Sequence, residues 1–346
     1  MEATMMLADG SCPAVTTSSI EAAIEAGSPF WLDIVDLDAT ALDWLSKVFK
    51  FHPLAIEDAE HFGQRPKVEQ YDDFAQMVLF GASDDVGEDG YSAESAEVHC
   101  LYAEKFLVTI RDASSSKTMA QVREKATLWR HHMQAGTVML LYRIADALVD
   151  GYFPVMARFD DAIDDIEEQI LASPTDAQVG VLFKMKRQLV SLRKLVTPER
   201  DMFASLLAGS ADLPGMTEDA ERYFRDLYDH LIRLSDLVDS YRDLLTSAVD
   251  THLSTVSNKL NDVMKQLTIL ATIFLPLSFL TGFFGQNFSW LVGHINGLGV
   301  FLIFGIGSEV VAVALLLYLF WTRGWLGSRQ PRPVRRRRQT AEDLPA

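Results

Sequence analysis

The chain has 346 residues, enough for more than one domain, and a formal net charge of −17 at pH 7. So large an acidic excess argues against a nucleic-acid partner and favours a surface that gathers cations. From Arg323 onward seven arginines outnumber Glu342 and Asp343, so the acidic excess lies in the first 265 residues.

No enzyme motif stands out: the sequence has no P-loop, dinucleotide fingerprint, H-E-x-x-H motif or Ser/His/Asp set. Cys12 and Cys100 lie outside any C-x-x-C pattern, which indicates neither structural zinc nor a disulfide framework. The N-terminus lacks a basic region followed by an apolar core, so we expect no signal peptide and a reducing cytoplasm for the acidic region. We therefore expect a protein that is not an enzyme and has no organic cofactor.

Residues 1–135 predict a cytoplasmic α/β domain. Strands rich in β-branched and aromatic residues are expected at Phe30–Asp36, Phe74–Phe80 and within Val98–Arg111, and an amphipathic helix at Ala41–Phe49. The acidic stretch SDDVGEDG at 83–90 is the best hairpin signal. The stretches HPLAIEDAE and QRPKVE, at 52–60 and 64–69, have no spacing that pairs acids with bases, and we interpret them as solvated loop and cap residues.

Residues 136–215 predict a helical hairpin. Leu140–Ala172 has apolar residues at helical spacing, and Gly151 and Pro154 should bend it. Ala177–Ala208 is basic in its middle, which favours an antiparallel pair joined at 173–175. The first helix has an acidic face, either a solvated surface or an ion site, and the pattern favours the solvated surface. Its members are Asp160, Asp161, Asp164, Asp165, Glu167 and Glu168.

One long helix should begin after Thr217, a candidate N-cap, because neither Pro nor Gly occurs until Pro276. At a rise of 1.5 Å per residue it would be roughly 100 Å long, so residues 216–265 should form a stalk that continues into a membrane span. An apolar seam near heptad spacing predicts self-association around an axis. The seam residues are Tyr223, Leu227, Leu231, Leu234, Val238, Tyr241, Leu245, Val249, Val256, Leu260 and Val263.

Residues 266–322 predict a domain of two transmembrane helices, Gln266–Phe284 and Leu298–Trp321. Lysines precede the first span and arginines follow the second, so both ends should be cytoplasmic by the positive-inside rule. The basic tail, 323–346, should contact anionic lipid headgroups; a nucleic-acid patch is the alternative. Only Glu309 interrupts the second span, where a polar neighbour or a proton should neutralise it, and a proton-coupling role is conceivable.

One face of the first span and of the helix before it is mostly polar or small, at steps of three, four or seven residues. Two explanations are open: close helix packing through small residues, or a water-filled axis lined by several copies of the chain. The residues on this line are Ser247, Asp250, Ser257, Asn261, Met264, Ala271, Leu275, Ser278, Gly282 and Gly285.

The segment SNKLNDVMKQLTILATIFLPLSFLTGFFGQNF, 257–288, resembles the first transmembrane helix of the CorA family of divalent-metal channels, which ends in a Gly-x-Asn signature. Here the signature is Gly285-Gln286-Asn287, and the unusual middle residue leaves the ion preference open. HPLAIEDAE and QRPKVE are similar to stretches of the family's N-terminal domain. The resemblance implies an α+β membrane protein that forms a homopentameric funnel in the inner membrane.

The resemblance also implies roles for matching residues. A ring of Asn287 amides would hold the waters of hydrated Mg²⁺ at the ion entry, with Gly285 letting the backbone turn; a helix C-cap is the alternative role of Asn287. Met264 and Leu267 would form the gate, and Asn261, Leu275 and Ser278 would line the pore. Asp250 would add an acidic ring. Asp226, with Asp84 or Asp85 of a neighbouring copy, would hold a regulatory Mg²⁺ that keeps the pore closed.

We therefore expect a homo-oligomer, pentameric by resemblance, that transports Mg²⁺, with Co²⁺ and Ni²⁺ as further substrates. One alternative is zinc transport, as in ZntB-like relatives whose signature also varies. The other is a membrane-anchored coiled-coil scaffold or sensor that conducts nothing. The polar line along the first span argues against this alternative. The loop at 288–297 contains no Asp or Glu, so cation capture at the outer mouth should be weak.

Overall fold

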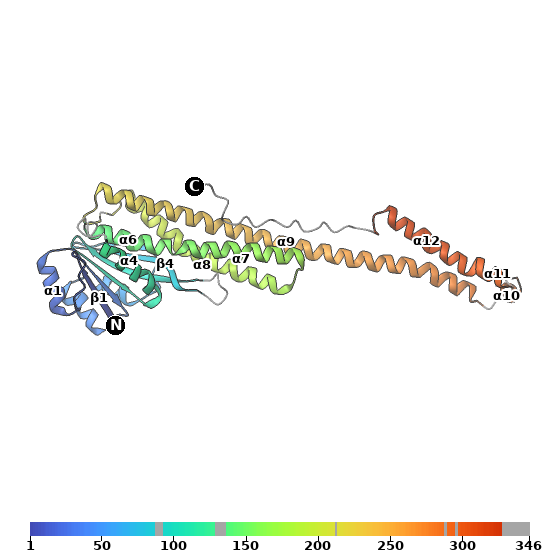
Figure 1. Cartoon of the computed structure of the whole chain (residues 1–346), viewed down its shortest axis with the longest axis horizontal. Coiled ribbons are helices and arrows are strands. Elements are labelled where there is room, and N and C mark those ends of the chain that lie inside the picture. Colours follow the sequence, from blue (N-terminus) through green and yellow to red (C-terminus); the bar gives the residue numbers. More distant parts are fainter. Residues whose placement is uncertain (87–92, 129–135, 212, 287–288, 295–296, 327–346) are drawn as a thin grey trace. The chain divides into compact units, whose positions relative to one another are not determined.

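The computed structural model describes residues 1–86, 93–128, 136–211, 213–286, 289–294 and 297–326 (Figure 1). Side chains at 84–86, 93–94, 126–128 and 291–292 are not described. The chain divides into two compact units, one from Met1 to Leu253 and one from Ser254 onward. The first is α+β and the second is helical in its described part, as the sequence predicts.

A six-stranded sheet forms the centre of the first unit, with the spatial order β1-β2-β6-β5-β4-β3. Neighbouring strands are antiparallel except for β2 and β6, which are parallel. The strands predicted at 30–36, 74–80 and 98–111 are confirmed, and β4 and β5 pair antiparallel across the predicted hairpin, whose tip at 87–92 lies outside the described residues. The strands are β1 (Glu2–Leu7), β2 (Phe30–Val35), β3 (Lys67–Gln70), β4 (Ala75–Val86), β5 (Ala93–Ala103) and β6 (Phe106–Arg111).

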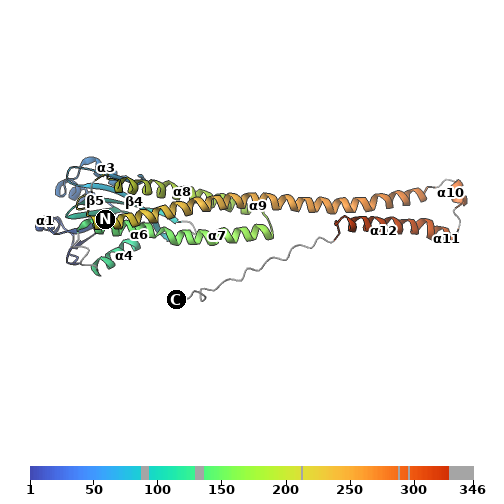
Figure 2. The same ribbon diagram turned by 90° about the horizontal axis from the view of Figure 1, so that it is seen from above.

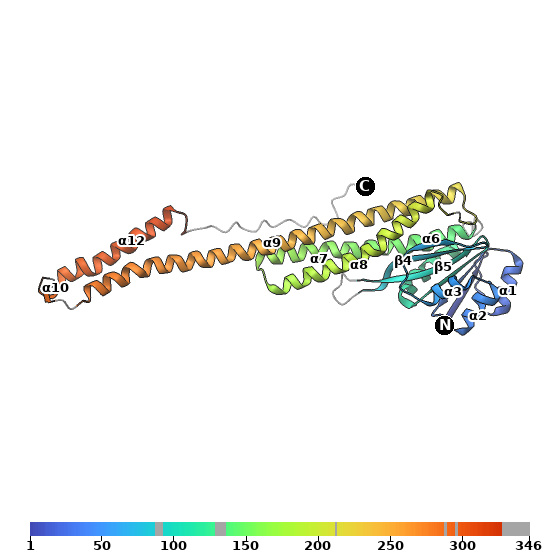
Figure 3. The same ribbon diagram turned by 180° about the vertical axis from the view of Figure 1, so that it is seen from behind.

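Successive residues of a strand point to opposite faces, so the sheet contributes to two cores. Leu32, Val108 and Ile110 pack with the short helices on one face, whereas Met77 and Leu107 pack with the long helices on the other (Figure 3). The elements on the first face are α1 (Thr17–Ala26), α2 (Ala39–Asp43), the π turn η1 (Trp44–Val48) and α3 (Pro53–Glu60). His52 caps α3 by accepting a hydrogen bond from the Leu54 N–H at 3.2 Å, which agrees with the cap interpretation of HPLAIEDAE.

The other face carries η2 (Ala113–Ser115), α4 (Ser116–Leu128) and α6 (Thr137–Asp150), followed by the long helices α7 (Tyr152–Ala172) and α8 (Asp176–Leu207). The interruption predicted at Gly151 and Pro154 falls at Gly151, where α6 ends and α7 begins, and Pro154 lies in the first turn of α7. The predicted joint at 173–175 also holds, with Ser173 ending α7 and Thr175 capping α8.

Helix α9 (Glu218–Phe284) is continuous over 67 residues. Thr217 caps it, since its Oγ1 accepts the Ala220 N–H at 3.1 Å. Within the first unit α9 lies beside α7 and α8 (Figure 2). The Phe203 ring of α8 is 6.1 Å from Phe224, and Lys186 Nζ is 3.3 Å from Thr246 Oγ1, so α8 runs antiparallel to α9.

The seam residues between Leu227 and Leu245 do not face another copy of the chain. Leu227, Leu231, Leu234 and Val238 are at most 2% exposed, and they pack in a core shared with α6, α7 and α8. Self-association along this part of the seam is therefore a wrong prediction. The physical reason is that a heptad-like stripe fits any helical partner, and the chain supplies its own.

The second unit contains the end of α9, α10 (Ser289–His294), α11 (Leu298–Val300), the π turn η3 (Phe301–Ile306) and α12 (Gly307–Thr322). Two of its helical segments, one in α9 and one at Leu298–Thr322, are long and apolar enough to cross a membrane, and neither is covered by the rest of the chain. Their large apolar side chains are therefore available to lipid or to other copies.

A charged network joins β2, β6 and α4 of the first unit. Asp33, 2% exposed, places Oδ2 at 2.9 Å from Arg111 Nη2 and 2.7 Å from Arg123 Nη2. Its Oδ1 accepts a hydrogen bond from Thr109 Oγ1 at 2.7 Å. We predict that Asp33→Ala lowers the free energy of unfolding by about 3–5 kcal/mol, because it leaves a buried guanidinium without its partner.

The denaturant midpoint of the full-length protein, followed by near-ultraviolet circular dichroism, measures this change. Asp43→Ala is the matched control, since Asp43 pairs with Lys47 on the surface, where both side chains are more than half exposed. That control should cost less than about 1 kcal/mol. Equal losses of unfolding free energy in the two variants would contradict the conclusion that the buried network stabilises the fold more than the surface ion pair does.

Glu199 of α8 is fully buried against the sheet, where Oε1 accepts the Phe80 N–H at 3.0 Å. Burial raises the pKa of this carboxyl to about 8, and the hydrogen bond opposes the shift. In the unfolded chain the same group titrates at about 4.3. The unfolded state therefore loses its proton first, and the folded state becomes less stable as pH rises through this window.

We predict that Glu199→Gln keeps the acceptor for Phe80 and removes this pH dependence. The variant should match the wild type in thermal midpoint at about pH 4.5 and exceed it at about pH 8. Glu168→Gln, an exposed change on α7, should leave the pH profile unaltered. A Glu199→Gln profile parallel to that of the wild type would show that the buried carboxyl is not the titrating group.

Candidate ion pathway and metal cluster

The residues predicted to line the pore share an uncovered face of α9. In the second unit Met264, Leu267 and Leu275 are 64%, 66% and 74% exposed, and Asn261 and Ser278 are also exposed. Asp250, at the end of the first unit, is exposed as well. Amide and hydroxyl side chains in a lipid-facing position would lose their hydrogen bonds to water, so this face needs a polar or protein neighbour.

Helix α12 covers a different side of α9. Thr281 Oγ1 of α9 lies 2.9 Å from Glu309 Oε1 of α12, and Leu277 borders a groove with Glu309 and Val310. Helix geometry turns about 100° per residue, which places Leu277 and Thr281 roughly 100° away from the line through Leu275 and Ser278. The chain therefore pairs its two spans without closing the predicted pore face.

The signature Gly285-Gln286-Asn287 follows directly after the last residue of α9. The Gly285 N–H donates to the Thr281 carbonyl at 2.9 Å, and the Gln286 N–H donates to the Phe283 carbonyl at 3.3 Å. Gly285 does not have the left-handed backbone of a typical turn glycine. A Cβ at Gly285 would instead come within 3.0 Å of the Thr281 carbonyl, which explains the small residue. Asn287 lies outside the described residues.

The residues predicted to hold regulatory Mg²⁺ lie in the first unit. Asp226 is exposed on α9, so it is free to face another subunit. Asp84 and Asp85 belong to β4, close to the hairpin tip, but their side chains are outside the described part of the chain. The pairing of Asp226 with either of them stays a prediction.

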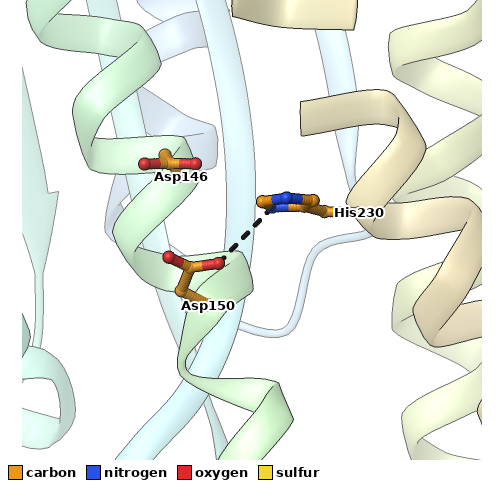
Figure 4. A group of neighbouring side chains, drawn as sticks. All are labelled: Asp146, Asp150 and His230. Carbon is orange, nitrogen blue, oxygen red and sulfur yellow. Dashed lines mark ion pairs between the residues drawn. The ribbon is translucent and has the colours of Figure 1, made fainter. Parts of the chain in front are cut away.

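A cluster of possible metal ligands that the sequence did not predict lies beside Asp226. Asp146 and Asp150 of α6 and His230 of α9 each offer a ligand atom, and these atoms lie within 4.8 Å of one another (Figure 4). His230 Nδ1 is 3.5 Å from Asp150 Oδ1. Carboxylate oxygens and an imidazole nitrogen are ligands that divalent transition metals accept, and carboxylates alone suit Mg²⁺.

The carboxylates of this cluster already face one cation, since Arg143 Nη1 lies 3.8 Å from Asp146 Oδ2. Burial and then the charge of Asp150 raise the pKa of Asp146, so the two carboxylates repel each other. The pKa of Tyr142 is raised by burial and by Asp146, and Asp226 adds to the same effect. Asp226 therefore contributes to the negative potential around the cluster.

The sequence contains one signal for this cluster, the spacing of Asp146 and Asp150, which lie one helical turn apart. The approach of His230 depends on how α9 packs against α6 and could not be read from the sequence.

Comparisons with known proteins fit this architecture. A family model described as "CorA-like Mg2+ transporter protein" matches residues 27–330. The chain belongs to the CorA family. The family consists of membrane transporters and not enzymes, which confirms the expectation from the missing enzyme motifs.

The chain is similar to two CorA-related sequences and to one solved structure, among others. The cobalt/magnesium transport protein CorA of Thermotoga maritima is 34% identical over 316 residues, covering 90% of this chain and 88% of that protein. The zinc transport protein ZntB of Yersinia pseudotuberculosis is 26% identical and covers 89% of this chain and 91% of its own length. The complete structure of the CorA magnesium transporter from Methanocaldococcus jannaschii has the same fold, with a TM-score of 0.75, 24% identity and coverage of 94% of this chain and 99% of that one.

Proposed function

We propose that this chain is one subunit of a pentameric channel in the inner membrane that carries Mg²⁺, and also Co²⁺ or Ni²⁺, into the cytoplasm. The observation that carries the proposal is the uncovered line on α9, where Asn261 just before the apolar segment and Ser278 within it are both exposed in a single chain. Several copies around an axis would place this line against a water-filled pore and leave the remaining apolar faces in contact with lipid.

The ion would enter at the signature. Mg²⁺ releases its waters reluctantly, so an uncharged ring of Asn287 carbonyl oxygens would bind the hydrated ion by accepting hydrogen bonds from its waters. Further along, rings of Met264 and Leu267 would close the pore by excluding water when they approach one another. A ring of Asp250 at the inner end would attract cations.

The orientation follows from charge. Lys259 and Lys265 precede the first span and arginines follow the second, which supports cytoplasmic placement of both termini. The basic tail, whose residues 327–346 lie outside the described part of the chain, would lie against anionic lipid headgroups. Mg²⁺ or Co²⁺ is favoured over Zn²⁺ because the cobalt/magnesium relative is the more similar, at 34% against 26% identity.

The function is tested by ion flux into liposomes that contain the purified protein. We predict faster uptake of Mg²⁺ than of Zn²⁺, and a loss of Mg²⁺ uptake of about tenfold or more in Asn287→Ala, because alanine offers no acceptor to the hydrated ion. Asn296→Ala, in the same loop, is the matched control and should conduct normally. Faster Zn²⁺ uptake would favour the zinc alternative, and a monomeric protein without flux would favour the scaffold.

Closure of the channel would depend on cytoplasmic Mg²⁺ bound between subunits. Asp226 on α9 and Asp84 or Asp85 of a neighbouring copy would share the ion, which offsets their mutual repulsion. The cluster of Asp146, Asp150 and His230 supports this location, because its negative potential would concentrate Mg²⁺ at the same surface. Loss of the ion would let the subunits separate and the pore open.

We predict that Asp226→Asn raises the internal Mg²⁺ concentration needed for half-closure severalfold, since one of the shared ligands loses its charge. Flux measured against internal Mg²⁺ in liposomes gives this value. Asp219→Asn, an exposed change in the first turn of the same helix, should leave it unaltered. Unchanged Mg²⁺ sensitivity of Asp226→Asn would rule out the regulatory role while leaving conduction untouched.

A further inference from the structure

One face of α8 combines exposed basic and apolar side chains. Lys184, Arg187 and Val190 follow one another at steps of three residues, and all three are exposed. Phe183, next to Lys184 on the same face, is 53% exposed. Aromatic and aliphatic side chains that share a face with arginine are typical of a surface that contacts another protein.

Other basic residues of α8 have partners inside the chain. Lys186 Nζ is 3.3 Å from Thr246 Oγ1, and Arg193 Nε is 3.3 Å from Asp239 Oδ1, so both bases reach α9. At about 100° per residue they lie roughly 100–120° around the helix from Arg187. The face that contains Arg187 therefore points away from the contact between α8 and α9.

Helix α7 has an exposed face of opposite charge. Asp164, Asp161 and Ala157 are exposed, and they lie on the side of α7 opposite its buried residues Phe159 and Ile163. The helices α7 and α8 lie on different sides of α9 (Figure 2). The hairpin therefore presents an acidic face on one helix and a basic face on the other, each directed away from the shared core.

The two faces have their charges at the same height above the joint of the hairpin. Helix α7 ends at Ser173 and α8 is capped by Thr175, and each helical residue adds 1.5 Å along the axis. Asp164 precedes Ser173 by nine residues, and Lys184 follows Thr175 by nine. Both side chains therefore start roughly 14 Å from the joint.

The match continues along both helices. Asp161 and Arg187 are each twelve residues from the end of their helix, which is roughly 18 Å from the joint. Ala157 and Val190 come next, at roughly 22–24 Å, so a small residue lies level with an exposed apolar one. Opposite charges and complementary sizes thus recur in the same order on the two faces.

We propose that the basic face of α8 binds the acidic face of α7 in the next copy of the chain, with Arg187 beside Asp161 and Val190 against Ala157. Copies rotated about an axis parallel to these helices keep their height, so the matched levels meet. The contact joins unlike faces, and such contacts close into a ring when the rotation closes. The inference rests on the proposed assembly around an axis and adds a surface that holds neighbouring copies together.

An anionic lipid surface is the other partner that a basic helix face could bind. It fits the hairpin less well, because Asp161 and Asp164 lie at the same height as the bases and would be repelled by the same headgroups. A second copy satisfies both faces at once, and a lipid surface satisfies only one.

Cross-linking of the full-length protein in lipid vesicles tests this contact. Two versions of the chain with different affinity tags are co-expressed, one with Ala157→Cys and one with Val190→Cys, and both contain Cys12→Ser. Cys100 is buried, so it should not react. A short bis-maleimide should link two chains in the mixture of versions and in neither version alone.

Charge reversal provides the second measurement. Arg187→Glu in the Val190→Cys version should lower the cross-linked yield severalfold, because the reversed charge faces Asp161, and Asp161→Arg in the other version should restore it. Lys194→Glu is the matched control. It lies on the same face of α8 but roughly 29 Å from the joint, beyond the level of Asp161, so the yield should stay unchanged.

Each outcome decides the inference. A cross-link within either version alone would show that like faces meet, and no cross-link in the mixture would show that the two faces are apart; both results overturn the proposal. A cross-link that forms only in vesicles of neutral lipid would show that anionic headgroups occupy the basic face, and would also overturn it. Light scattering gives the size of the assembly independently. An oligomer without the cross-link leaves the proposed channel standing, whereas a monomer overturns both.

Discussion

The structure depends on one helix, α9, which packs against its own chain over its first half and is uncovered over its second half. Over its first half, α9 buries Leu227, Leu231 and Leu234 against helices of its own chain. From Leu260 on, its apolar side chains are uncovered, and the same helix becomes a candidate membrane span. The sequence contains neither Gly nor Pro between Thr217 and Leu275, so nothing interrupts the backbone hydrogen bonds of α9 over this stretch. The change from one to the other is made by side chains alone.

Much of the fold could be predicted because local patterns and tertiary packing agree. Gly151 separates α6 from α7, Thr217 caps α9, and the strand at Phe30–Val35 lies where β-branched and aromatic residues indicate it. The partner of the α9 seam could not be predicted, since a periodic stripe such as Leu227–Leu245 specifies that a helix packs and not against which helix. The sheet order, with β2 parallel to β6, depends on contacts between residues far apart in sequence.

Part of the candidate site could also be predicted from the sequence, and part of it could not. The exposed line through Asn261 and Ser278 follows from helical spacing, so it could be located before the structure. The cluster at Asp146 and His230 could not, because its ligands come from helices that meet only in the folded unit. Glu309 was visible as an isolated charge in an apolar run, but Thr281, whose hydroxyl donates to it, could be identified only from the packing of α12 on α9.

Because α6, α7 and α8 already cover the first half of α9, each chain buries this part of the helix without another copy. Contacts between copies can then form and break as rigid surfaces slide past one another, with little newly wetted apolar area to penalise the motion. A chain whose seam depended on its neighbours would have to melt part of its core to make the same movement.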